Sequence, residues 1–89
     1  MEVEFDAAKS AANKTKHGID FDEANALWSD PHRIEVPART SVETRFLVIG
    51  MIGMRHWSAV ITYRGEKVRI ISVRPSRREE VKLYESKGE

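Results

Sequence analysis

The chain has 89 residues, of which 40% are hydrophobic and 33% charged, with no cysteine and a formal net charge of +1. The lack of cysteine excludes disulfides and thiolate zinc sites, and no apolar run reaches the roughly 20 residues of a membrane-spanning helix. We therefore expect a single domain over residues 1–89 with no membrane contact. A cytoplasmic location is expected because the acidic N-terminus lacks the basic region of a signal peptide.

Charge is unevenly distributed along the chain. Residues 1–44 contain five Lys/Arg and nine Asp/Glu (net −4), whereas residues 45–89 contain ten and five (net +5). This asymmetry predicts a basic surface on the C-terminal half that would suit a polyanion or an acidic protein. The alternative is a solvated sheet face whose charges keep the strand edges from aggregating.

The N-terminal segment predicts a short strand over residues 2–5 and a helix over residues 7–17. Asp6 is suited to cap the start of this helix, and Gly18 is suited to end it in a left-handed conformation. We expect a stripe of small residues on the helix to pack closely against a sheet. Its members are Ala8, Ala11 and Ala12.

Asp20 and Glu23 have the spacing of a capping box, which predicts a second helix that ends before Asp30-Pro31. The proline-containing stretch that follows, as far as Ser41, is interpreted as an edge strand and a loop. The expected core face of the second helix comprises Phe21, Ala24, Leu27 and Trp28.

Three strands are predicted over residues 45–51, 57–64 and 67–74, where aromatic and β-branched residues lie between glycine-containing turns. Gly65 at the first central position of a two-residue turn predicts a type II′ hairpin that pairs Arg64 with Lys67. Alternation then assigns the side chains to two faces. The face under the helices should carry Trp57, Ala59, Ile61, Tyr63, Val68 and Ile70. The other face, partly open, should carry Val60, Thr62, Arg64, Lys67, Arg69 and Ile71.

A short C-terminal helix is expected to begin at Pro75-Ser76, with a capping box between Ser76 and Glu79. The predicted fold class is therefore α+β. Two N-terminal helices would pack on one face of a mostly antiparallel β-sheet, followed by the short C-terminal helix.

Histidine and arginine side chains are the first candidates for chemistry. His17 ends the first helix beside Lys16 and could act as a general acid or base, although a cationic last turn explains it equally well. His32 and His56 fall in turn-like contexts and receive no role.

Arginines near the hairpin turn could bind phosphate, because guanidinium groups bind its oxygens bidentately. Arg64, Lys67 and Arg69 converge there if the hairpin register holds. Strict alternation puts Arg74 on the other face from Arg64, unless the strand bends at Pro75.

Metal ligation is not expected, since helix capping explains the densest carboxylate cluster, Asp20, Asp22 and Glu23. The chain also lacks a phosphate-binding glycine loop and a nucleophile elbow. If it is an enzyme, RNA cleavage without metal or cofactor fits best, because the substrate's own 2′-hydroxyl is the nucleophile. The protein then supplies proton transfer and cations, in which Glu80 or Tyr84 could share.

Several motifs together resemble those of the BrnT toxins of bacterial type II toxin-antitoxin systems, over nearly the whole chain. They are Lys16-His17-Gly18-Ile19-x-Phe21-x-Glu23-Ala24, Arg45-Phe46, Tyr63-Arg64-Gly65, Val68-Arg69-Ile70-Ile71-Ser72-Val73-Arg74 and Glu80-x-x-x-Tyr84-Glu85. Two positions depart from the family pattern. Ala7 stands where many relatives have proline, and the hydroxyl of Ser76 lies one position early for capping the last helix.

This resemblance implies a RelE-like fold and an endoribonuclease that restrains translation and growth. It also implies a BrnA-type antitoxin, a ribbon-helix-helix protein that neutralises the toxin and carries it to their own promoter DNA. The matching positions suggested for function are Lys16, His17, Arg64, Arg69, Arg74, Glu80 and Tyr84.

Two other functions stay open. The chain could be a non-catalytic module that only joins its antitoxin on DNA, with the arginines at the interface. It could also be a general RNA-binding domain, but its two candidate stacking residues, Trp57 and Tyr63, are both assigned to the buried face.

Overall fold

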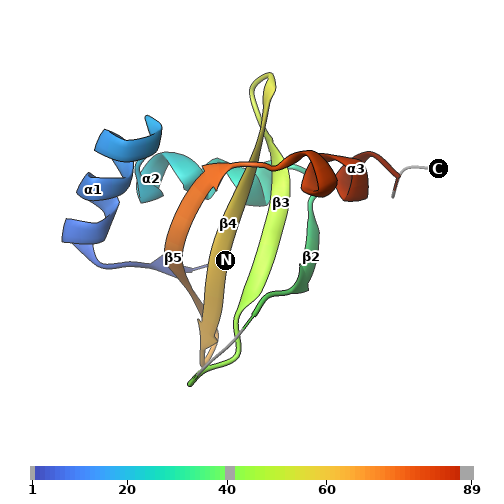
Figure 1. Cartoon of the computed structure of the whole chain (residues 1–89). Coiled ribbons are helices and arrows are strands. Elements are labelled where there is room, and N and C mark those ends of the chain that lie inside the picture. Colours follow the sequence, from blue (N-terminus) through green and yellow to red (C-terminus); the bar gives the residue numbers. More distant parts are fainter. Residues whose placement is uncertain (1, 40–41, 87–89) are drawn as a thin grey trace.

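The computed structural model describes residues 2–39 and 42–86. Its centre is a five-stranded sheet in the order β1-β5-β4-β3-β2 (Figure 1). All neighbouring strands are antiparallel except β1 and β5, which are parallel. In chain order the elements are β1 (Val3–Glu4), α1 (Ala7–His17), α2 (Phe21–Ala24), the 3-10 helix η1 (Asn25–Ser29), β2 (Ile34–Pro37), β3 (Phe46–Ile52), β4 (Arg55–Arg64), β5 (Lys67–Pro75) and α3 (Arg78–Ser86).

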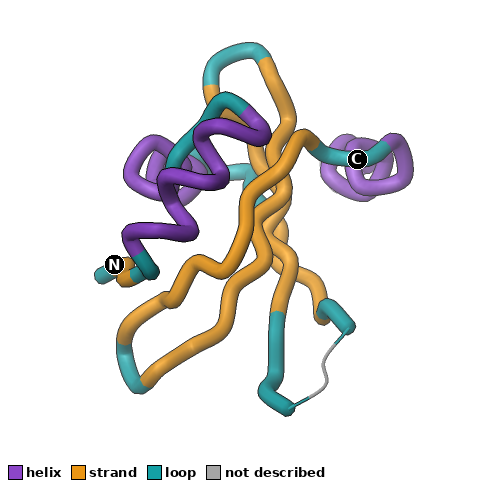
Figure 2. The backbone as a smooth tube through the Cα atoms, turned by 60° about the vertical axis from the view of Figure 1, so that its left-hand side comes forward, coloured by secondary structure: helices purple, strands orange, loops and turns teal. Residues whose placement is uncertain are grey.

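The helices lie on both sides of this sheet. α1 and α2 cover one face, whereas α3 crosses one end of the other face (Figures 1 and 2). The main core lies under α2 and includes Phe21, Leu27 and the inward side chains of β4 and β5. The predicted α+β class and the helix layout are therefore confirmed. Among the described residues, no helix is long and apolar enough to cross a membrane.

The predicted ends of the first two helices are confirmed. The Asp6 carboxylate accepts hydrogen bonds from two amides of the first turn of α1, and Gly18 ends the helix with a φ of 84°. Asp20 and Glu23 form the reciprocal capping box, with bonds of 2.7 and 2.9 Å. α2 is short and continues as η1, which ends before Asp30 as expected.

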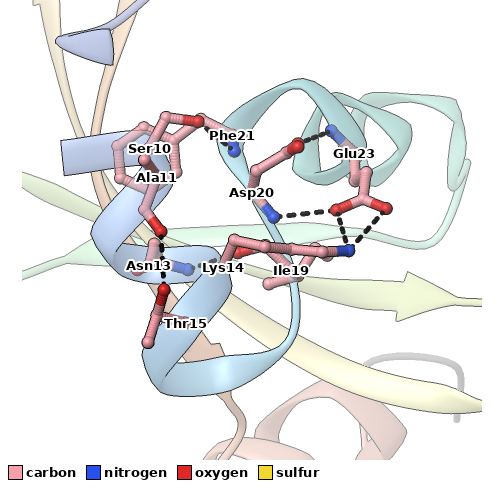
Figure 3. A network of polar contacts seen from close by, with 9 residues as sticks. All are labelled: Ser10, Ala11, Asn13, Lys14, Thr15, Ile19, Asp20, Phe21 and Glu23. Atoms are coloured by element: carbon pink, nitrogen blue, oxygen red, sulfur yellow. Dashed lines mark hydrogen bonds and ion pairs between the residues drawn. The ribbon is translucent and has the colours of Figure 1, made fainter. Parts of the chain in front are cut away.

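The packed face of α1 differs from the prediction, because two polar side chains point inward. Ser10 accepts a hydrogen bond from the amide of Phe21 (2.9 Å), and Asn13 donates to the carbonyl of Ile19 (2.8 Å) (Figure 3). Asn13 also accepts from the amide of Val73 at the edge of β5 (3.2 Å). These backbone groups need partners that alanine cannot supply. The alanines expected to pack, Ala8, Ala11 and Ala12, are exposed.

The hairpin between β4 and β5 has the predicted register, with Arg64 opposite Lys67. Gly65 has a φ of 61°, and among the described residues only glycines have a positive φ. The first central residue of the turn therefore has a positive φ and the second, Glu66, does not, as the predicted type II′ turn requires. Farther along, the register shifts, so that Ile70 faces Ile61 while Ser72 faces Val60. One extra residue, Ile71, is thereby accommodated as a β-bulge.

The bulge changes the face of the following residues. Val73 is fully buried in the core, and Arg74 pairs with Ser58 on the face opposite α1 and α2. Arg74 therefore shares a face with Arg64, and the bend responsible lies at Ile71 rather than at Pro75.

Two smaller expectations are wrong. Tyr63 points to the helix side, as predicted, but lies beyond the helices and is 43% exposed. The capping box between Ser76 and Glu79 does not form, because the hydroxyl of Ser76 bonds to that of Ser58 (2.7 Å). Ser76 lies directly after β5, and its amide donates to the carbonyl of His56 (3.1 Å). Instead Glu80 accepts from the amide of Arg77 (2.8 Å), just before α3.

Candidate active site

An ion pair between Arg74 and Glu80 joins the end of β5 to α3. The guanidinium donates twice to the carboxylate, at 2.7 and 2.8 Å, and the hydroxyl of Ser58 donates to the same carboxylate at 2.9 Å. Glu80 is only 7% exposed. The hydrogen bonds from Arg74 lower the pKa of Glu80 to about 2, helped by the amide of Arg77 and by Ser58. At neutral pH this carboxylate is therefore a fixed anion and does not carry protons.

Tyr84 lies one turn after Glu80 on the same helix. Its hydroxyl donates a hydrogen bond of 2.7 Å to Asp30. Burial, together with this bond to a carboxylate, raises the pKa of Tyr84 to about 12. The hydroxyl therefore stays protonated at neutral pH and anchors α3 to the end of η1.

Asp30 is a second anchor that the sequence did not reveal. Besides Tyr84, its carboxylate accepts from the amides of Met51 and His32, each at 2.8 Å. Burial alone would raise its pKa, but these hydrogen bonds lower it. Gly50 permits the close approach, because a Cβ there would lie 3.2 Å from Asp30 Oδ2 and 3.0 Å from a methyl of Leu27.

The sheet face opposite α1 and α2 carries Arg64, Arg69 and Arg74, and we call it the arginine face. The first two arginines are paired with acidic residues. Arg69 lies 2.9 Å from Glu4, and Arg64 lies 3.8 Å from Glu43. The basic half of the chain is thus partly neutralised by the acidic half. Such partly exposed pairs contribute little to stability and can exchange for other anions.

A family model described as "Ribonuclease toxin, BrnT, of type II toxin-antitoxin system" matches residues 5–80. The chain belongs to the BrnT toxin family. The resemblance in the sequence motifs is thereby confirmed, and with it the class of ribonuclease toxins of type II toxin-antitoxin systems. A search of curated proteins finds no match.

In this BrnT toxin, Lys16 and His17 lie apart from the Arg74–Glu80 pair. They form the last turn of α1, on the opposite face of the sheet. Asn13, in the preceding turn, contacts the amide of Val73, so these residues lie toward the same end of β5 as Arg74. Among the described residues, the side chains of Lys16 and His17 have no hydrogen-bond or ion-pair partner.

His56 lies beside the Arg74–Glu80 pair, and sequence reasoning gave it no role. Its ring nitrogen Nε2 lies 2.8 Å from a carboxylate oxygen of Glu85, and its ring packs edge-on against Tyr84 with centroids 5.2 Å apart. The alternation of side chains along β4 could have identified it. His56, Ser58 and Arg64 are an even number of positions apart on this strand, so they point to the same face. The assignment of His56 to a turn concealed it.

Proposed function

We propose that this BrnT toxin is a metal-independent endoribonuclease that binds RNA on the arginine face. The observation that supports this most is the alignment of Arg64, Arg69 and Arg74 on one face of the sheet. Guanidinium groups bind phosphate oxygens and stabilise the charge that builds on phosphorus during cleavage. RNA is the substrate class because its 2′-hydroxyl supplies the nucleophile, so that the protein needs no metal-bound water.

In this proposal Arg74 contacts the scissile phosphate and Glu80 orients Arg74. A guanidinium has five N–H donors, and the bonds from Arg74 to Glu80 and to the carbonyl of Pro75 leave some of them available to a phosphate. Tyr84 would act indirectly, because its hydrogen bond to Asp30 holds α3 in place. Arg64 and Arg69 would bind neighbouring phosphates by exchanging their carboxylate partners.

Lys16 and His17 stay in the proposal through the family resemblance. They would contact RNA that passes around the end of β5 to the side of α1. The partner proposed for the toxin is a BrnA-like ribbon-helix-helix antitoxin that covers the arginine face and carries the toxin to promoter DNA. Covering this face would inhibit the toxin because the antitoxin and RNA would compete for the same arginines.

The test is cleavage of purified RNA in the presence of EDTA, repeated in a translation extract to include ribosome-dependent cleavage. The wild type should cleave with EDTA present, and Arg64→Gln should weaken RNA binding several-fold. Lys9→Gln is the matched control, because Lys9 is exposed on α1. This substitution removes the same charge from the opposite side of the sheet. Cleavage that disappears with EDTA would contradict metal independence, and equal losses in both variants would contradict the arginine face.

One observation favours a second function. Arg64 and Arg69 already pair with acidic residues of the same chain, which is typical of a structural surface. A toxin relative that acts only as a co-repressor with its antitoxin would have such a surface. In that case the wild type would cleave no RNA under either condition and would still join its antitoxin on promoter DNA.

A further inference from the structure

We propose that His56, oriented by Glu85 and Tyr84, is the general base of the RNA cleavage site. This inference rests on the proposed ribonuclease function and assigns a residue that neither the motifs nor the family match singles out. Of the histidines, His17 lies on the side of α1 and His32 lies in the turn after η1. His56 alone of the three lies on the arginine face of the sheet.

The position of His56 follows from the register of the sheet. Ser58, two residues later on β4, bonds to Glu80 and is the direct partner of Arg74. The peptide after Pro75 is also tied to this point, since the amide of Ser76 donates to the carbonyl of His56 (3.1 Å). Diagonal neighbours on one face of a sheet are about 7–8 Å apart, so Arg74 and His56 can reach the same phosphodiester.

The contact with Glu85 determines which nitrogen is available. An ionised carboxylate can only accept a hydrogen bond, so Nε2 carries the proton that it shares with Glu85 at 2.8 Å. Nδ1 is then the basic nitrogen. Among the described residues Nδ1 has no hydrogen-bond partner, and the side chain of His56 is 22% exposed. A ring held by a carboxylate with its other nitrogen free is the arrangement that proton abstraction requires.

The groups around His56 favour this role. On α3, Glu85 contacts the ring directly and Tyr84 packs against it as a neutral phenol held by Asp30. On β3 the cross-strand neighbour is Met51, which is uncharged. Arg55 points its guanidinium to Trp57 at 5.0 Å, and thus to the other face. Arg74 and Glu80 neutralise each other. Glu85 is therefore the contacting charge, and it stabilises the imidazolium that forms when the base takes a proton.

The proposed step balances without another reactant. Nδ1 of His56 takes the proton of the 2′-hydroxyl while the 2′-oxygen forms a bond to phosphorus. The bond from phosphorus to the 5′-oxygen breaks, and this oxygen takes a proton from water. The products are a 2′,3′-cyclic phosphate and a 5′-hydroxyl, and the imidazolium returns its proton to solvent.

The test measures kcat and KM for RNA cleavage by the wild type and three variants, with folding checked by thermal melting. His56→Gln should reduce kcat by about 100-fold or more with little change in KM. His32→Gln is the matched histidine control, since His32 is exposed in the turn after η1, and it should stay near the wild type. Glu85→Gln replaces a carboxylate whose side chain is 60% exposed, and we expect it to fold even if His56→Gln does not. Because it no longer stabilises the imidazolium that forms during the reaction, this variant should lower kcat several-fold with little change in KM.

A merely structural contact between His56 and Glu85 would change the melting temperature and leave kcat unchanged. An active wild type whose Glu85→Gln variant or His56→Gln variant keeps the wild-type kcat overturns the inference and leaves the ribonuclease proposal intact. A wild type that cleaves neither free RNA nor RNA on ribosomes overturns both.

Discussion

Glu80 is one of the residues that attach α3 to the sheet, through its ion pair with Arg74. Replacing it with glutamine leaves the guanidinium of Arg74 without a counter-charge at a site where the carboxylate side chain is 9% exposed. We expect Glu80→Gln to lower the free energy of unfolding by about 3 kcal/mol, measured by urea denaturation. The double variant Arg74→Met/Glu80→Leu removes both charges and should recover most of this loss. A single variant as stable as the wild type would contradict the importance of the pair.

The same residue predicts how stability depends on pH. The pKa of Glu80 is about 2 in the folded protein against an ordinary value of 4.5, so the folded state favours the ionised form. Its contribution to the free energy of unfolding is therefore fully present above about pH 4.5 and is lost as the pH falls through about 2. Urea denaturation from pH 7 to pH 2 should show the wild type and Glu80→Gln converging in stability. A constant difference over this range would be the contrary result.

At the scale of the element, α1 is held by polar side chains rather than by an apolar stripe. Asn13 satisfies the carbonyl of Ile19 and the amide of Val73 together, and it is only 8% exposed. Asn13→Ala should lower the free energy of unfolding by about 2–3 kcal/mol, because it leaves both backbone groups unpaired. Ala12→Ser is the matched control on the exposed side of α1 and should change stability little. Equal losses of stability for the two substitutions would contradict this packing and would indicate that the alanine side of α1 also contacts the sheet.

The same helix illustrates how far the sequence predicts the fold. Asp6, Gly18 and the Asp20–Glu23 box define helix ends through contacts within four residues, so local pattern was sufficient. The packed side of α1 depends on backbone groups that belong to β5 and to the turn before α2, and no property of the helix itself indicates them.

The candidate site was predictable to a similar extent. Glu80 was identified as a motif residue, but its pairing with Arg74 depends on the path of the chain between β5 and α3. The bulge at Ile71 decides the face of Arg74, and residues 67–74 contain no glycine or proline that would predict it. His56 is the exception, since extending the predicted strand of residues 57–64 backwards by one residue would have placed it on the arginine face.

For the molecule as a whole, the fold brings the acidic half of the sequence against the basic half. Glu2 and Glu4 lie beside Lys67 and Arg69, and Glu43 lies beside Arg64 and Arg45. The uneven charge along the chain therefore becomes a set of local pairs across the sheet and its loops. In the proposed function, RNA that binds the arginine face would displace these carboxylates, which would act as competing anions.

This competition can be tested with Glu4→Gln, which frees Arg69 from a carboxylate 2.9 Å away. A 2′-O-methyl RNA serves as the ligand, because its blocked 2′-oxygen cannot attack phosphorus. We expect its affinity to rise several-fold at low salt. The slope of log affinity against log salt should steepen by about 0.7, the value for one further phosphate contact on a single strand. Asp22→Asn is the control, since it removes the same charge from an exposed position on α2. If both variants gain affinity equally, only the net charge of the protein matters. A gain confined to Glu4→Gln would instead mean that Arg69 contacts the RNA and that Glu4 limits the affinity of the free toxin.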